Sequence, residues 1–219
     1  MRNTTADILN GANFLIRAAP DLDTARIALW RLMQVVSKFP DAGWVDALSG
    51  GQTMSKKWLI SKAKEKWGGY AFDHTVAVGG WVGTLAFFIN VAGYPISKWD
   101  SVDLDSYANS AARELNPGDF FSAHDADMYD YEYSKDSLVI NTACEHIPDL
   151  SLWIDKLPSG TKVILQSNNM FEIPDHTSCV HSVGGFLEQT KGSLSDVTMD
   201  TLPLPWNGWK RFMLMGYKT

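Results

Sequence analysis

The sequence predicts an α/β protein: a doubly wound, mostly parallel sheet that ends in an antiparallel hairpin and is preceded by helices. Two observations predict this class. From about residue 70 onward, short β-branched runs alternate with segments of helical periodicity, which is typical of a parallel sheet covered on both faces. The last two β-like runs are instead joined by the short loop LPLPWNGWK, as in a hairpin.

Length and charge limit the possible functions. The chain has 219 residues, 45% of them hydrophobic, which is enough for one substantial domain with a buried core. Lys plus Arg number 19 and Asp plus Glu number 25, so the net charge is -6 and binding to nucleic acid is not expected. Two cysteines, Cys144 and Cys179, are too few for a disulfide framework and suit a reducing compartment.

No segment is expected to enter a membrane. The amino-terminal sequence MRNTTADILNG contains Asp7 and lacks an apolar core with a cleavage site, so no signal peptide is expected and the predicted location is the cytoplasm. Residues 75–97 carry no charge and match a bilayer span in length. Glycines, Asn90 and Pro95 interrupt them, so a buried strand, turn and helix is expected instead.

Helices are predicted over the first seventy residues, and we expect them to form an N-terminal helical cap over residues 1–69. Asp23 or Thr24 would cap a helix that Pro40 ends. A second, amphipathic helix would begin near Thr53 or Ser55 and end at Gly68-Gly69. Tryptophans in the helical stripes are expected in the core, namely Trp30, Trp58 and Trp67.

Residues 70–219 are expected to form the α/β domain. Its predicted strands are 76–78, 101–104, 120–121, 138–141 and 163–166. Helices are predicted at 82–92, 107–115, 150–157 and 186–189. The closing hairpin is predicted from 197–202 and 211–217.

The segment VAVGGWVG lies at the turn between the first of these strands and its helix. Gly79, Gly80 and Gly83 would let backbone amides approach a ligand closely. Tight packing of the strand on the helix explains the same glycines about equally well.

Acidic residues follow at the ends of the next two strands. Asp103 lies twenty positions after Gly83 in SVDLDSY, where a carboxylate can accept from both ribose hydroxyls of a nucleoside. Asp105 fits helix capping better. In SAHDADMYDY, Asp125 is placed to accept from an adenine amino group, although a solvated loop explains such aspartates almost as well.

In order, these segments resemble the class I S-adenosylmethionine-dependent methyltransferases, from roughly Phe72 to the carboxyl terminus. The most specific match is DSLVINTACEHIPDLSLWIDKLPSGTKVIL, where a strand ends in a polar residue and Glu-His, a helix, a proline-glycine turn and another strand follow. The resemblance implies a Rossmann-like methyltransferase domain over residues 70–219. It also implies S-adenosylmethionine as cofactor and methyl transfer to a small-molecule acceptor.

The resemblance further implies a set of donor-binding residues. Gly79 and Gly83 would line the methionine part, Asp103 would hold the ribose, and Asp125 with Ala126 would flank the adenine. The complete expected set is Gly79, Gly80, Trp81, Gly83, Asp103, Leu104, Asp125, Ala126 and Asn141.

Methyl transfer mainly requires an acceptor held in line with the methyl group, and a base if the acceptor carries a proton. His146, next to Glu145, is the predicted base, with Asn141 beside the donor. The alternative role of Glu145 and His146 is to cap and orient a helix start. Polar residues expected to leave the following strand toward the acceptor are Gln166, Asn168 and Asn169.

Other acceptors and a metal are less favoured. The strand end reads NTAC, which differs from the N-P-P-Y-like run of enzymes that methylate nucleic-acid bases; a protein acceptor stays open. His176, Cys179 and His181 form H-x-x-C-x-H and could complete a metal site with Cys144 or His146, but the spacing differs from the common zinc patterns. No metal site is therefore predicted.

Two departures from the family pattern keep other functions open. Ala77 replaces the usual acidic residue before the glycines, and Trp81 replaces the middle glycine. A non-catalytic or regulatory protein that keeps the methyltransferase fold is one alternative. A nicotinamide-dinucleotide-binding protein is another, because VGGWVG approximates G-x-G-x-x-G with Val78 in place of the first glycine.

Overall fold

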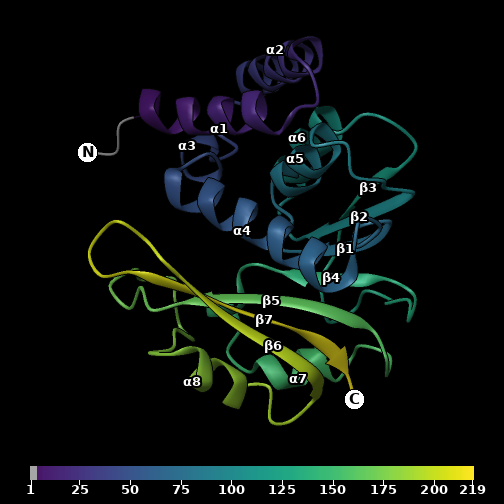
Figure 1. Ribbon diagram of the computed structural model, residues 1–219, viewed down its shortest axis with the longest axis vertical. Helices are drawn as coiled ribbons and strands as arrows, with labels where there is room; N and C mark the ends of the chain where they lie inside the picture. Colours follow the sequence, from purple (N-terminus) through teal and green to yellow (C-terminus); the bar gives the residue numbers. More distant parts are fainter. Residues whose placement is uncertain (1–3) are drawn as a thin grey trace. The chain divides into compact units, whose positions relative to one another are not determined.

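The computed structural model describes residues 4–219, with side chains from residue 9 onward, and divides into two compact units (Figure 1). The first unit joins residues 1–73 with 80–125, and the second joins 74–79 with 126–219. Residues 1–3 of the predicted helical cap, and the side chain of Asp7, lie outside the described part. The predicted division at residues 69 and 70 stays a prediction.

The first unit contains six helices within its described residues. Four precede the first strand: α1 (Thr4–Ala18), α2 (Leu22–Lys38), α3 (Trp44–Ala47) and α4 (Gly50–Trp67). The others, with two strands, are α5 (Thr84–Val91), β2 (Lys98–Asp103), α6 (Ser106–Leu115) and β3 (Phe121–Asp125). Helix α1 packs against α2, α3, α4 and α5, while α6 packs against β2 and β3.

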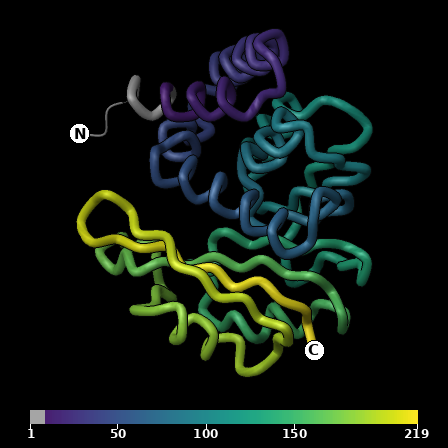
Figure 2. The backbone as a smooth tube through the Cα atoms, viewed as in Figure 1, coloured from purple at the N-terminus to yellow at the C-terminus, as the bar shows by residue number. Residues whose placement is uncertain are grey.

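The second unit contains five strands, two short helices and a 3-10 turn. The elements are β1 (His74–Val78), β4 (Leu138–Asn141), η1 (Cys144–His146), α7 (Leu150–Ile154), β5 (Lys162–Asn168), α8 (Val183–Glu188), β6 (Leu194–Pro203) and β7 (Lys210–Lys218). The tube in Figure 2 shows how β6 and β7 double back as a hairpin. Helix α8 packs against both of these strands.

The strands belong to one mixed sheet in the order β3-β2-β1-β4-β5-β7-β6. Strands β2 and β3 are parallel, as are β1 with β4 and β4 with β5, whereas β7 runs antiparallel to β5 and β6. In register, Asp103 lies opposite Asp125 and Val78 lies opposite Asn141. The predicted α/β class with a closing antiparallel hairpin is confirmed.

The uncharged stretch 75–97 forms β1, a turn and α5, as predicted. Residues 75–78 of β1 and all of α5 except Asn90 are buried, because a strand and a helix covered by other elements need no charge. Among residues 4–219, no helix is both long and apolar enough to span a bilayer.

The predicted starts of the two longer N-terminal helices were wrong. Helix α2 is capped by Asp21, whose Oδ1 accepts from the Thr24 amide at 2.7 Å, and not by Asp23 or Thr24. Helix α4 is capped by Ser49 and already includes residues 50–52. The prediction missed this start because the helix begins with two glycines, which are poor helix formers. Its predicted end is confirmed, since Gly68 is the C-cap with φ 82°.

The core prediction for Trp30 was also wrong, because its side chain is 64% exposed. Helix α2 buries Ala25, Ala28, Leu32 and Val35, a stripe spaced by three and four residues on another face of the helix. Trp58 and Trp67 are half-buried. Treating the large aromatic Trp30 as a core residue therefore gave the wrong buried face for α2.

Strand β4 has the predicted limits, and all four of its residues are buried. Strand β5 is longer than predicted and runs to Asn168. Asn168 therefore lies within the strand and does not lead out of it, while Asn169 directly follows.

Replacing Asp105 tests the capping of α6. Its Oδ1 accepts from the amides of Tyr107 and Ala108 at 2.9 and 3.0 Å, so Asp105→Ala should lower the free energy of unfolding by about 1 kcal/mol in urea denaturation. Asp105→Asn keeps the acceptor and should stay close to wild type. Equal losses in both variants would show that the cap does not stabilise this helix.

Candidate functional site

The carboxylate of Asp103 at the end of β2 links two neighbouring segments of the first unit. Its Oδ2 accepts from the Trp81 amide at 2.9 Å, and its Oδ1 accepts from the Asp105 amide at 3.0 Å. Each carboxylate oxygen can accept more than one hydrogen bond. The predicted role at a ribose is therefore compatible with these bonds and stays a prediction.

A residue that the sequence analysis missed, Asn109, fixes the ends of β2 and β3. Its Nδ2 lies 3.0 Å from the Asp103 carbonyl oxygen, 3.1 Å from the His124 carbonyl oxygen and 2.8 Å from Asp125 Oδ1. The side chain is fully buried, and a buried amide is retained where it is hydrogen-bonded. An asparagine among the alanines of the helix predicted at 107–115 was the available signal.

The predicted adenine residue Asp125 is about half exposed and already partnered. Its Oδ1 accepts from Asn109 and from Arg113 at 3.2 Å, while Arg113 also donates to the Ala123 carbonyl oxygen. Leu104, beside Asp103, is 74% exposed. The edge of the first unit thus offers carboxylates and an apolar side chain together. Ala126 is the first residue of the second stretch of the second unit.

Trp81 adopts a conformation that usually belongs to glycine. Its φ is +49°, a left-handed value that costs about 1 kcal/mol for a residue with a side chain. The ring packs so tightly on Gly43 that a Cβ built there would lie 2.3 Å from Cζ2 of the indole. Within the first unit, the tryptophan thus lies against the residue before α3, and this packing offsets the strain.

Two glycines of the turn are required for different reasons. Gly83 has φ +71°, and a Cβ there would lie 2.7 Å from Asn116 Nδ2 and 3.0 Å from the Ala112 Cβ, so close packing on α6 excludes a larger residue. Gly79 has φ +62°, but a Cβ would meet only the Ala143 Cβ at 3.8 Å. Packing thus accounts for Gly83 and backbone conformation for Gly79. Gly80 lies between them, its amide donating to the Val102 carbonyl oxygen.

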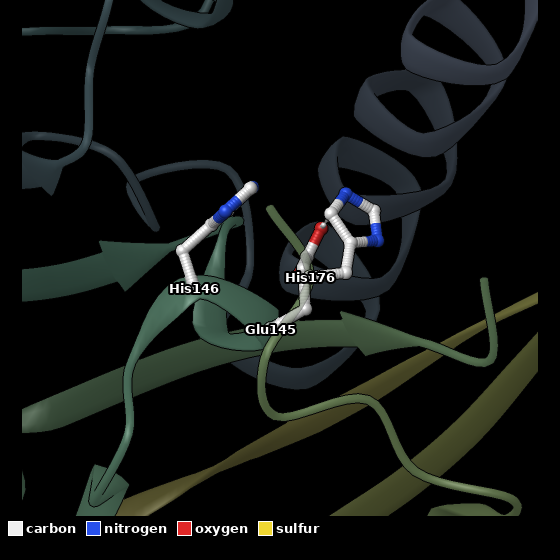
Figure 3. Close-up of side chains that lie close together, drawn as sticks. All are labelled: Glu145, His146 and His176. Carbon is white, nitrogen blue, oxygen red and sulfur yellow. Dashed lines mark ion pairs between the residues drawn. The ribbon is translucent and has the colours of Figure 1, made fainter. Parts of the chain in front are cut away.

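In the second unit, the segment after β4 brings Glu145 and His146 close to His176, which follows β5 (Figure 3). One ligand atom from each of the three lies within 4.8 Å of the others. Glu145 is 3% exposed, and its Oε1 lies 4.0 Å from His176 Nε2. Asn141 is also buried, and its Oδ1 accepts from the Ala143 amide at 2.9 Å.

Hydrogen bonds determine which ring nitrogens carry protons. His146 Nδ1 lies 2.8 Å from the Asp175 carbonyl oxygen, which can only accept, so Nδ1 holds the proton. His176 Nδ1 lies 3.2 Å from Asn168 Oδ1. The Met170 amide donates to the same oxygen at 2.9 Å, so this atom is an acceptor and His176 Nδ1 is the donor. Burial lowers the pKa of His176, and the Glu145 carboxylate partly opposes this shift. In the neutral state, both rings therefore have a lone pair on Nε2.

The three residues expected to contact an acceptor have structural partners in the second unit. Gln166 is buried, with Nε2 3.5 Å from Met213 Sδ. Asn168 Oδ1 accepts from the Met170 amide and from Cys179. Asn169 Oδ1 accepts from the Lys210 amide at 2.7 Å and so holds the start of β7. Contact with an acceptor stays a prediction for all three.

The H-x-x-C-x-H residues do not form one cluster. Burial raises the pKa of Cys179, and its thiol donates to Asn168 Oδ1 at 3.2 Å. The exposed His181 ring instead lies 4.4 Å from that of Phe171. Among residues 9–219, the group of ligand-type side chains that converges is Glu145, His146 and His176.

Replacing Asn109 tests whether it holds the ends of β2 and β3. Asn109→Leu leaves two carbonyl oxygens and Asp125 without this donor, so the free energy of unfolding should fall by about 1 to 3 kcal/mol in urea denaturation. The matched control is Ser110→Ala, next on the helix, which removes only a bond to the Ser106 carbonyl oxygen. A wild-type stability for Asn109→Leu would contradict the assignment.

Replacing Gly43 tests the packing of Trp81. The left-handed φ of +78° and the clash with the indole predict that Gly43→Ala destabilises the chain by about 2 to 4 kcal/mol. Thermal unfolding of Gly43→Ala, Trp81→Ala and the double variant gives the coupling. The double variant should be more stable than the sum of the single losses implies, and strict additivity would show that the indole does not pack there.

Neither a protein-family model nor a curated protein matches the sequence. Solved structures do match the fold. N-methyltransferase NodS from Bradyrhizobium japonicum WM9, in complex with S-adenosylhomocysteine, has TM-score 0.63 and 9% identity, and the match covers 86% of this chain and 98% of NodS. Phosphoethanolamine N-methyltransferase 2 from Haemonchus contortus, in complex with S-adenosylmethionine, has TM-score 0.56 and 10% identity, over 79% of this chain and 58% of that chain. The chain therefore has the fold of S-adenosylmethionine-dependent methyltransferases.

Proposed function

We propose that the chain transfers a methyl group from S-adenosylmethionine to a small-molecule acceptor. The observation that carries the proposal is the position of Asp103, a fixed carboxylate at the carboxyl end of β2, where nucleosides bind in open α/β sheets. Two solved N-methyltransferases of the same fold hold the demethylated donor and the donor itself. S-adenosylmethionine is thus the proposed cofactor.

Asp103 and its neighbours are the proposed nucleoside ligands. Asp103 keeps acceptor capacity for ribose hydroxyls after bonding to two backbone amides, and the exposed Leu104 would contact the base. Asn109 would act as a positioning residue, because it holds Asp125 and the backbone of Asp103. Gly79 and Gly83 remain the proposed residues lining the methionine part, and Gly80 and Trp81 remain in the proposed donor-binding set.

Residues after β4 and β5 are proposed to act on the acceptor. Asn141, fixed by the Ala143 amide, is proposed to hydrogen-bond the donor. His146 is the proposed base, because its Nε2 keeps a lone pair while Nδ1 donates to Asp175. Gln166, Asn168 and Asn169 remain the proposed acceptor ligands.

Donor binding is measured by calorimetric titration with S-adenosylmethionine and S-adenosylhomocysteine. Asp103→Ala should weaken binding by about 1 to 3 kcal/mol, through loss of charge-assisted hydrogen bonds to the ribose. Asp105→Asn, which changes the neighbouring acidic residue and keeps the helix cap, should bind like wild type. Unchanged affinity in Asp103→Ala would assign Asp103 to structure alone.

The competing functions give different results in the same titrations. Heat with a nicotinamide dinucleotide and none with either methionine nucleoside would favour the dinucleotide alternative. Donor binding without turnover would favour a regulatory protein. Incubation with methyl-labelled donor and a metabolite extract should move label into a small product; label found only in protein would contradict the proposed acceptor class.

A further inference from the structure

We propose that Glu145, His146 and His176 form a binding site for a divalent transition-metal ion. The first two residues lie in η1 and the third in the loop after β5, and their side chains converge (Figure 3). Ligand atoms from all three lie within 4.8 Å of one another. The proposal goes beyond methyl transfer, and it concerns residues of the second unit alone.

The first argument comes from the lone pairs. His176 Nε2 lies 4.0 Å from Glu145 Oε1, and its Nδ1 proton is committed to Asn168 Oδ1. In the neutral tautomer of His176 that this bond favours, the Nε2 lone pair therefore lies near a carboxylate oxygen. An ion bound at about 2.0 to 2.2 Å from each atom would bridge this separation at a wide angle.

The second argument is the buried carboxylate. Glu145 is 3% exposed, and its Oε2 has no hydrogen-bond partner among the described residues. A buried ionised carboxylate without compensation costs several kcal/mol. A bound dication would supply the missing charge and occupy the unpartnered oxygen.

The third argument concerns the hydrogen-bond acceptors that orient the two histidine rings. A metal-binding histidine usually donates its other ring N–H to a carbonyl or carboxylate oxygen, which orients the ring and fixes its tautomer. His146 donates to the Asp175 carbonyl oxygen, and His176 donates to the Asn168 side chain, which the Met170 amide holds in place. Both rings are therefore oriented as ligands before any ion arrives.

The ligand set indicates the class of ion. Two imidazoles and one carboxylate suit Zn²⁺, Co²⁺ or Fe²⁺ better than Mg²⁺ or Ca²⁺, which prefer oxygen ligands. A tetrahedral site places ligand atoms about 3.4 Å apart, so side-chain shifts of about 1 Å would complete it. Three protein ligands leave a coordination position open for water or for an acceptor oxygen.

The experiment uses untagged, chelator-treated protein without methyl donor, titrated with Co²⁺ by absorption spectroscopy and with Zn²⁺ by calorimetry. One ion per chain is expected. Glu145→Gln, His146→Gln and His176→Gln should each weaken binding at least about a hundredfold, since losing even an outer partner costs about ten- to a hundredfold. The matched control His181→Gln should bind like wild type. Wild-type affinity in the three ligand variants would overturn the proposal.

Stability of the metal-free protein gives a second readout that does not depend on metal titration. Glu145→Gln replaces a buried carboxylate whose Oε2 has no hydrogen-bond partner among the described residues, so this variant should unfold at the wild-type temperature or above it without metal. Zn²⁺ should then raise the unfolding temperature of wild type and leave that of the variant unchanged. Arg211 is buried, and its positive charge helps to lower the pKa of His176. A metal-free variant less stable than wild type would mean that protein groups such as Arg211 already stabilise Glu145, and this result would overturn the proposal. Failure of donor binding would leave these results untouched.

Discussion

The Asp103 carboxylate is the constraint on which the edge of the first unit depends. A single side chain holds the amide of Trp81 after β1 and the amide of Asp105 before α6. Asn109 holds the backbone of Asp103 from the other side and adds the end of β3. Because these bonds join chain segments far apart in sequence, the glycine turn, the helix cap and the two strand ends are positioned together. A ligand at this edge would meet groups that are already oriented, which reduces the entropy lost on binding.

The sequence predicts a structural feature well when residues close together in the chain determine it, and poorly when packing against distant segments determines it. Strand β4 has its predicted limits because four buried apolar or amide residues between turn signals leave little choice, and Asp105 caps α6 as its position suggests. Trp30 and Asn109 could not be placed in this way. Which face of α2 is buried depends on the elements packed against it, and the partners of Asn109 come from two strands that periodicity alone does not place beside it.

The sequence leaves two explanations open for the glycine turn, namely backbone conformation for ligand approach and tight packing of the strand on the helix. Different glycines of the turn fit different explanations. Gly83 is a packing residue, because α6 leaves no room for a Cβ, whereas Gly79 is needed for its backbone conformation alone. Trp81 keeps the left-handed conformation of a glycine without being one. Its indole packs on Gly43, so the departure from the family pattern has a structural partner within the same unit. That partner lies 38 positions earlier in the chain, too far for motif spacing to indicate it.

In the second unit, His146 has two proposed roles, as a base and as a metal ligand. His146 has one lone pair, because its Nδ1 proton is committed to the Asp175 carbonyl oxygen. That lone pair can accept a proton or bind an ion, but it cannot do both at once. The buried Glu145 would contribute to ion binding, because its Oε2 has no hydrogen-bond partner among the described residues and its Oε1 lies 4.0 Å from His176 Nε2. With an ion bound, His146 would serve as its ligand, and without an ion its Nε2 lone pair is available for the proposed role as base.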